Sequence, residues 1–231
     1  MNIKIFSDGA NKAEMIEMNN NPLIEGFTTN PSILRKAGVT NYEEFAKDIL
    51  SIITEKPVSF EVIADDFETM KKQAIKIASW GKNVFIKIPI TNTKNETTKN
   101  LINDLNWSGI KINVTAITTI KQVETVLNKI PYGRGMYISI FAGRIADTGV
   151  SPIPIVEKAV NMVKGTDIEI IWASTREIIN IFQAEEVGCH IITCTQDILK
   201  KFPLIGKDLT EYSLDTIKMF NEDVKKAGYK L

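Results

Sequence analysis

Short apolar runs rich in β-branched residues recur along the chain, and polar segments separate them. A short apolar run bounded by polar or turn residues is typical of a strand that is buried on both faces. We predict eight such strands, at residues Ile3–Asp8, Ile24–Thr28, Val58–Val62, Val84–Ile88, Ile110–Val114, Met136–Ile140, Ile168–Trp172 and His190–Cys194.

Longer segments with the amphipathic spacing of helices lie between these runs. The alternation of strands and helices within 231 residues predicts a single α/β domain over residues 1–231, a (β/α)8 TIM barrel. A doubly wound open sheet is the alternative. The clearest helical segments are Glu43–Thr54, Glu68–Trp80, Thr97–Leu105, Ile120–Lys129, Ile155–Val163 and Glu177–Val187.

One further helical segment, Ser213–Ala227, has no strand after it. Ser213 is a candidate N-cap of this helix, and Gly228 is a candidate stop. We expect the helix to cover the bottom of the barrel or to pack on a neighbouring subunit. Its apolar face consists of Leu214, Ile217, Phe220 and Val224.

Composition narrows the class of function. Lys and Arg together number 28, as do Asp and Glu, so the net charge is zero and we expect no nucleic-acid partner. Hydrophobic residues make up 44% of the chain, without a long apolar run or a basic-then-apolar leader, so we expect a cytoplasmic protein with no membrane partner. The single histidine His190 and the two cysteines, Cys189 and Cys194, lack the spacing of a metal site, so we expect no metal ion and two reduced thiols.

The stretch Val84–Pro89 is apolar except for Lys87. An ammonium group inside a buried strand is costly unless it is paired or loses its proton. Pro89 ends this strand because it donates no hydrogen bond to the ladder. A lysine whose pKa is lowered by burial, at the carboxyl end of a strand, suits an enzyme that forms an imine with a carbonyl substrate. The alternative is a lysine that reaches out to solvent.

Barrel enzymes carry their chemistry at the carboxyl ends of the strands, where alternate side chains point into the barrel. This alternation predicts that Ser59 and Glu61 point inward from the third strand, and that Asn113 and Thr115 point inward from the fifth. Glu61 is then the expected partner of Lys87, either in catalysis or in a structural ion pair.

Three other polar residues have a second interpretation. Asp8 ends the first strand and is a candidate acid/base or a helix N-cap. Asn30, followed by Pro31, has the pattern of an N-cap as well as a place at the strand ends. Lys111 shares the inward alternation of Asn113, but it begins its strand and is therefore a weaker candidate nucleophile than Lys87.

Arg144 and Arg176 follow two neighbouring strands. Two arginines that converge on a helix N-terminus suit a phosphate or carboxylate, and solvated surface arginines are the alternative. Ser174 and Glu177 have the spacing of a capping box, and a helix N-terminus also binds phosphate.

Together these stretches resemble the transaldolase family, in particular its small single-barrel members, which include the fructose-6-phosphate aldolases. The resemblance covers essentially the whole chain. The run of Thr-Thr-Asn-Pro-Ser and the lysine strand are specific in combination. The matching motifs are Gly26–Ser32, Ile86–Pro89, Asn113–Ala116, Ser139–Asp147 and Ala173–Arg176.

The resemblance implies a transaldolase in which Lys87 forms a Schiff base with a ketose phosphate such as fructose 6-phosphate or sedoheptulose 7-phosphate. It implies that Glu61 moves protons through a water held by Thr115, and that Asp8 takes the proton of the C4 hydroxyl. A dihydroxyacetone unit then passes to an aldose phosphate, without a metal or an organic cofactor. The implied substrate-binding residues are Asn30, Asn113, Ser139, Phe141, Arg144, Ser174 and Arg176, of which Arg144, Ser174 and Arg176 hold a phosphate.

Fructose-6-phosphate aldolases resemble this chain but carry glutamine in place of Glu61 and tyrosine in place of Phe141. Phe141 has no hydroxyl that could protonate the carbanion, which favours transfer over release of free dihydroxyacetone. The alternatives are such an aldolase, a non-catalytic barrel that binds sugar phosphates, and a deoxyribose-phosphate type of aldolase, against which the Thr28–Ser32 stretch speaks. Small members of the family often form rings of subunits, so we expect a homo-oligomer.

Overall fold

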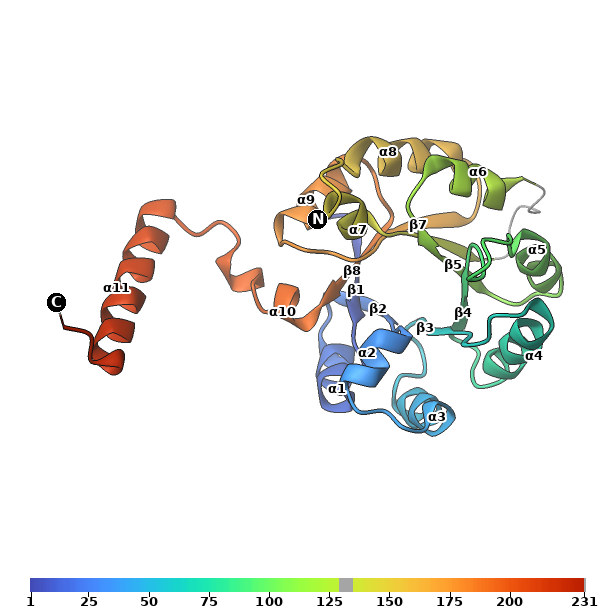
Figure 1. Ribbon diagram of the computed structural model, residues 1–231, viewed down its shortest axis with the longest axis horizontal. Helices are drawn as coiled ribbons and strands as arrows, with labels where there is room; N and C mark the ends of the chain where they lie inside the picture. The colour runs from blue at the N-terminus through green and yellow to red at the C-terminus, as the bar shows by residue number, and fades with distance from the viewer. Residues whose placement is uncertain (129–134, 231) are drawn as a thin grey trace. The chain divides into compact units, whose positions relative to one another are not determined.

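The computed structural model describes residues 1–128 and 135–230. Residues Met1–Leu199 form one compact unit, and the residues from Lys200 onward form a second. In the first unit, helices surround a central ring of strands (Figure 1). Among the helices that the structure describes, none is long and apolar enough to cross a membrane.

The strands form a closed parallel barrel in chain order, with β1 paired to β8, which confirms the predicted (β/α)8 barrel. The alternative of an open sheet is wrong because the ring closes. The strands are β1 (Lys4–Asp8), β2 (Ile24–Thr28), β3 (Val58–Glu61), β4 (Val84–Pro89), β5 (Ile112–Ile117), β6 (Met136–Ile140), β7 (Ile168–Trp172) and β8 (Ile191–Thr195).

The predicted fifth strand, Ile110–Val114, lies too early, because β5 begins at Ile112 and continues to Ile117 through a bulge. Val114 pairs with Ile138, and Ile117 pairs with Ile140, so two residues of β5 lie opposite Ser139 alone. The backbone of the second of them, Ala116, is left-handed with φ 61°. Such strain in a non-glycine residue is found mostly at functional sites.

The helices of the first unit begin and end near the predicted positions where apolar periodicity is strong. The helix predicted at Ile120–Lys129 ends at Leu127, and Lys129 lies outside the described residues. The helices are α1 (Lys12–Asn20), α2 (Pro31–Lys36), α3 (Tyr42–Ile52), α4 (Phe67–Ala78), α5 (Lys99–Trp107), α6 (Ile120–Leu127), α7 (Ala142–Ala146), α8 (Ile153–Met162), α9 (Ile179–Glu186) and α10 (Gln196–Leu199).

A layer of apolar side chains fills the barrel interior. The ring of Tyr137 stacks on Phe85 at a centroid distance of 4.1 Å, and the edge of Phe6 meets Tyr137 at 5.9 Å. Ile171 and Ile191 complete this cluster. Each of these residues lies two positions before a residue that lines the cavity described below, so the cluster forms the floor of that cavity.

The second unit contains a short 3-10 helix, η1 (Phe202–Leu204), and the long helix α11 (Leu209–Ala227). The prediction that Ser213 caps this helix is wrong. Asp208 is the N-cap, and its carboxylate accepts hydrogen bonds from the backbone N–H groups of Thr210 and Glu211. The predicted stop is confirmed, because Gly228 ends the helix in the left-handed conformation, with φ 68°.

Candidate active site

A cavity of about 460 Å³ opens at the carboxyl ends of the strands. Its wall includes ten of the eleven residues predicted for the site. Asn113, the eleventh, is fully buried and contacts the cavity wall through Ser139. The ten are Asp8, Asn30, Glu61, Lys87, Thr115, Ser139, Phe141, Arg144, Ser174 and Arg176.

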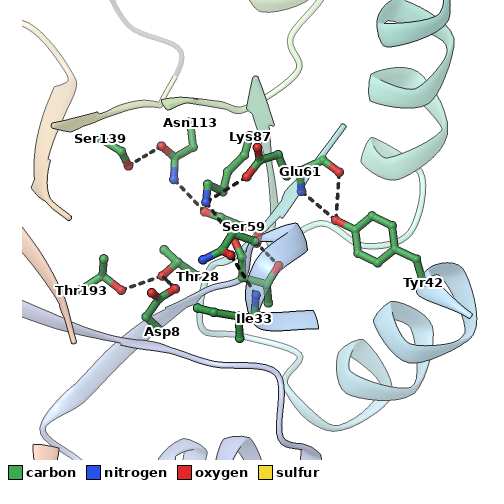
Figure 2. A network of polar contacts seen from close by, with 12 residues as sticks. Asp8, Thr28, Ile33, Tyr42, Ser59, Glu61, Lys87, Asn113, Ser139 and Thr193 are labelled. Atoms are coloured by element: carbon green, nitrogen blue, oxygen red, sulfur yellow. Dashed lines mark hydrogen bonds and ion pairs between the residues drawn. The ribbon is translucent and has the colours of Figure 1, made fainter. Parts of the chain in front are cut away.

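Lys87 is only 5% exposed, and its side chain points into the barrel rather than out to solvent. Its ammonium group donates a hydrogen bond of 2.8 Å to the backbone oxygen of Thr29 and lies 3.2 Å from Oε2 of Glu61. Glu61 and Lys87 face each other because their residues are paired in the β3–β4 register (Figure 2). A carboxylate at this distance can take up or return a proton of the amine. Lys111 instead donates to the backbone oxygen of Lys82 before β5 begins, at the other end of the barrel.

Asp8 lies across the cavity at the end of β1, in contact with β2. The hydroxyl of Thr28 donates a 2.7 Å hydrogen bond to Oδ1 of Asp8, and Thr193 of β8 lies 2.6 Å from the same hydroxyl (Figure 2). The Thr28 hydroxyl donates its only proton to Asp8. In its short contact with Thr193 it therefore accepts, and the Thr193 hydroxyl donates. Burial raises the pKa of Asp8 above its ordinary value, and the ammonium of Lys87 partly opposes this shift. The alternative in which Asp8 caps the next helix is wrong, because Asn11 caps α1.

Asn113, Ser59 and Ser139 form a buried chain of hydrogen bonds beside Lys87. The amide nitrogen of Asn113 donates to Ser59 at 3.1 Å, and the hydroxyl of Ser139 donates to the amide oxygen at 2.7 Å (Figure 2). This arrangement fixes which way the Asn113 amide faces. The buried hydroxyl of Thr115 follows in the β5 bulge, and it has no hydrogen-bond partner among the described residues. An unpaired hydroxyl in a polar cavity suits a bound water or a substrate hydroxyl.

Arg176 and Arg144 supply positive charge at another part of the wall. The guanidinium of Arg176 is held by Asp147, which accepts hydrogen bonds from Nε at 3.1 Å and Nη2 at 2.6 Å. Arg176 in turn lowers the pKa of Asp147.

The predicted capping box of Ser174 and Glu177 is wrong. The chain does not enter α9 directly after Ser174, because Ser174 adopts a left-handed backbone with φ 64°. The side chain of Asn180 accepts hydrogen bonds from the backbone N–H groups of Arg176 and Glu177 instead. Ser174 is therefore not used as a cap and lines the cavity.

Asn30 is both the N-cap of a helix and a residue of the cavity wall, as the two interpretations of its sequence predicted. Its side-chain oxygen accepts a 3.0 Å hydrogen bond from the backbone N–H of Ile33, so it caps α2, and Asn30 also lines the cavity. Sequence reasoning missed Thr28, Thr193, Lys36 and Asp147. Thr28 and Thr193 lie on the inward alternation of their strands, and Asp147 ends the matching motif Ser139–Asp147, so these signals could have identified them. No local pattern marks Lys36.

Within residues 1–128 and 135–230, no cluster of three His, Cys, Asp or Glu side chains could hold a metal ion. Cys189 and Cys194 are buried free thiols, and burial raises the pKa of each to about 12. His190 accepts a hydrogen bond from the backbone N–H of Ile170, away from the cavity wall.

The sequence was compared with known proteins. A model of the family described as "Transaldolase/Fructose-6-phosphate aldolase" matches residues 5–231. The chain belongs to this family. A "Probable transaldolase" of Thermoanaerobacter sp. (strain X514) is 37% identical, over 99% of this chain and all of the relative. One of Clostridium acetobutylicum is also 37% identical over the same shares, and one of Methanococcus maripaludis (strain C5) is 33% identical over 92% of this chain and 97% of the relative.

The barrel fold of this chain also occurs in solved structures that have little sequence similarity to it. A copper homeostasis protein, CutC, from Streptococcus agalactiae matches with a TM-score of 0.60 at 13% identity, over 84% of this chain and 98% of that chain. A phosphonomutase structure from Burkholderia cenocepacia J2315 matches with a TM-score of 0.58 at 10% identity, over 97% of this chain and 94% of that chain. At such identities the likeness shows the fold alone. Membership of the family, by contrast, makes the chain an enzyme of the transaldolase and aldolase type.

Proposed function

We propose that the chain is a transaldolase that moves a dihydroxyacetone unit from a ketose phosphate, such as fructose 6-phosphate or sedoheptulose 7-phosphate, to an aldose phosphate. The observation that carries this proposal is the buried Lys87, which shares one cavity with the carboxylates of Glu61 and Asp8. A nucleophilic amine with an acid/base group nearby and a second one across the cavity is what imine-based carbon–carbon cleavage requires.

The first stage forms the imine. Glu61 takes a proton from the Lys87 ammonium, and the neutral amine attacks the C2 carbonyl of the ketose. The proton that the nitrogen then loses passes to the carbonyl oxygen to give a carbinolamine. The hydroxyl of the carbinolamine leaves as water after Glu61 donates a proton through a water that Thr115 holds. The distance of 3.2 Å between Lys87 and Glu61 supports this role, as does the unpaired hydroxyl of Thr115.

The second stage breaks the C3–C4 bond. The Asp8 carboxylate takes the proton of the C4 hydroxyl, the bonding electrons move into the iminium, and the aldehyde phosphate departs. The enamine that remains on Lys87 then attacks the aldehyde carbon of the acceptor, and Asp8 returns the proton to the new hydroxyl. Water adds to the iminium that results, and the product ketose phosphate leaves as the amine of Lys87 is restored. Asn30, Asn113 and Ser139 hold the hydroxyls of the retained unit, and the arginines with Ser174 hold the phosphate.

The residue directly after β6 supports transfer rather than release. Phe141 lines the cavity and has no proton to give to the enamine carbon. The enamine therefore persists until an acceptor aldehyde arrives. An aldolase that releases free dihydroxyacetone is the second candidate, and a non-catalytic sugar-phosphate-binding barrel is the third.

The deciding experiment incubates the protein with fructose 6-phosphate, with and without erythrose 4-phosphate, and treats part of each sample with borohydride. We expect a reduced dihydroxyacetone adduct on Lys87, sedoheptulose 7-phosphate when the acceptor is present, and little free dihydroxyacetone when it is absent. Free dihydroxyacetone formed as fast as transfer would identify an aldolase. Sugar-phosphate binding without any adduct would identify a non-catalytic barrel.

The raised pKa of Asp8 predicts the pH dependence of cleavage. Because the carboxylate form accepts the proton, we expect the cleavage rate to fall on acidification, with a midpoint above the ordinary Asp value of 3.8. Single-turnover measurements of the cleavage rate from pH 4 to pH 8 test this decrease. A rate that stays constant down to pH 4 contradicts the role of Asp8.

The same shift gives the sign of a stability effect. A raised folded-state pKa means that the protonated form stabilises the fold below pH 3.8 and that this stabilisation is lost as the pH rises through the folded pKa. Asp8→Asn stays neutral and still accepts from Thr28, so we expect it to raise the thermal midpoint at pH 7 while it abolishes cleavage. A lower midpoint at pH 7 contradicts the burial argument.

We also propose a homo-oligomer held by α11. Ile217 and Phe220 lie on the apolar stripe of α11 and are each 59% exposed, and an apolar stripe of this kind is normally buried against a partner. We expect Ile217→Asp and Phe220→Asp to lower the mass measured by light scattering, and Lys218→Glu, on the polar side, to leave it unchanged. A wild-type protein with the mass of one chain contradicts the proposal.

A further inference from the structure

The hydroxyl of Tyr42, at the start of α3, makes two hydrogen bonds to the backbone of Glu61. It accepts from the N–H of Glu61 at 2.7 Å and donates to the carbonyl oxygen of Glu61 at 3.0 Å (Figure 2). One side chain from the helix layer therefore satisfies both backbone groups of the last residue of β3 that face β2.

The strand register explains why these two groups need such a partner. Thr28 pairs with Ser59, and the N–H of Thr29 donates to the oxygen of Ser59. If the parallel ladder continued, the N–H of Glu61 would donate to the oxygen of Thr29, and the oxygen of Glu61 would accept from the N–H of residue 31.

Neither of these ladder bonds forms. The oxygen of Thr29 accepts from the ammonium of Lys87 at 2.8 Å, and residue 31 is Pro31, which has no N–H. The carbonyl oxygen of Thr29 therefore binds Lys87 instead of the N–H of Glu61. The backbone N–H and C=O of Glu61 have no partner on β2 and bond to the hydroxyl of Tyr42. Unpaired, these two partly buried polar groups would destabilise the strand end.

The ring of Tyr42 is fixed by packing, independently of its hydroxyl. It meets Phe60 edge-on at 6.2 Å and Trp80 at 5.9 Å, and Phe60 and Trp80 meet each other at 6.0 Å. Burial raises the pKa of Tyr42, so the hydroxyl keeps the proton that it donates. Loss of the hydroxyl alone would leave this three-ring cluster in place.

We infer that Tyr42 is a positioning residue that replaces the missing β2 partner of Glu61 and so holds the Glu61 carboxylate against Lys87. The inference rests on the proposed function, because it assigns Tyr42 to the proton-transfer step of imine formation. Tyr42 does not line the active-site cavity, so its effect on the substrate passes through Glu61.

The test compares Tyr42→Phe with wild type in the rate at which borohydride traps the Lys87 adduct of fructose 6-phosphate. We expect the rate constant for adduct trapping and kcat to fall about 10- to 100-fold in Tyr42→Phe, because a small displacement of a proton-transfer group slows the reaction strongly. KM should change less than about twofold, because no substrate contact is lost. Tyr212→Phe removes the hydroxyl of a tyrosine on α11 that does not line the cavity, and it serves as the control with unchanged rates.

A double-mutant cycle separates positioning from a general structural effect. In a Glu61→Gln background, Tyr42→Phe should slow the reaction further by less than about twofold, because the group that it positions has already lost its function. A second readout is amide hydrogen exchange, in which Tyr42→Phe should speed exchange at Glu61 at least about 10-fold. The amide of Val62, which donates to the oxygen of Lys87, should stay protected.

The outcomes distinguish the two proposals. An adduct that forms on Lys87 equally fast in wild type and Tyr42→Phe overturns the inference and leaves the proposed transaldolase intact. So does a loss of the same size in both backgrounds, which marks a structural role. No adduct in wild type removes the proposed function, and with it the role given to Tyr42.

Discussion

Lys87→Met is expected to abolish the borohydride-trapped adduct and to lower the transfer rate by more than about 10⁴-fold. The amine is the only group in the proposed mechanism that forms a covalent bond with the substrate. Methionine has a similar length and fills the same buried space, so the barrel interior stays packed. Peptide mapping after reduction and a coupled assay of sedoheptulose 7-phosphate formation measure the two effects.

Lys111→Met is the matched control for this substitution. Lys111 lies one residue before β5, donates to the oxygen of Lys82 and contacts the ring of Phe85, away from the cavity. We expect full activity and an unchanged adduct. An adduct that persists in Lys87→Met, on any lysine, would show that the nucleophile has been assigned wrongly.

Gly143→Ala is expected to have the second largest effect, although residue 143 contacts no substrate. A Cβ at this position would lie 1.6 Å from the carbonyl oxygen of Ser174 and 3.1 Å from Cγ of Arg176. Backbone atoms cannot rotate out of the way as a flexible side chain can, so α7 and the end of β7 must separate. We expect a loss of about 3 kcal/mol in the free energy of unfolding, measured with urea.

The separation should also damage anion binding, because Arg144 and Arg176 lie on the two segments that Gly143 brings together. We expect KM for fructose 6-phosphate to rise at least about 10-fold, because a loss of this size corresponds to one charge-assisted hydrogen bond to the phosphate. Trapping of unphosphorylated dihydroxyacetone on Lys87 should persist, because it uses no phosphate contact.

Gly9→Ala provides the control for this substitution. Gly9 follows β1 on the same side of the barrel, and a Cβ built there has no heavy atom within 4 Å. We expect stability and KM to stay near the wild-type values. Equal KM values for Gly143→Ala and wild type would contradict the role given to the contact between α7 and Ser174.

Much of the barrel could be predicted because its strands are short apolar runs with few interruptions. The same alternation identified Glu61 and Asn113, since a two-residue period fixes which side chains face inward. Lys87 was found because a charged residue inside such a run conflicts with its surroundings. In each case the signal is local in sequence.

The parts that sequence reasoning missed depend on contacts between distant segments. Ser174 and Glu177 have the spacing of a capping box, yet Ser174 has a left-handed backbone and packs close to Gly143, and Asn180 accepts the hydrogen bonds instead. The predicted start of α11, at Ser213, lies after the true start at Leu209. Asp208 and Ser213 are both good N-caps, and the choice between them depends on where the preceding chain turns. The hydroxyl of Tyr42 meets Glu61 across nineteen residues, and no periodicity marks such a pair.

The closure of the barrel has a consequence for synthesis on the ribosome. Asp8 is among the first residues made, but Thr193, which orders its partner Thr28, belongs to β8. At chain elongation rates of about 5–20 residues per second, β1 waits on the order of 10–40 s for β8, with one edge unpaired. During that interval the exposed edge is where a chaperone would bind or where nascent chains would associate. A ribosome-bound fragment that lacks β8 also lacks Thr193, so the hydroxyl of Thr28 beside Asp8 has lost one of its two hydrogen-bond partners.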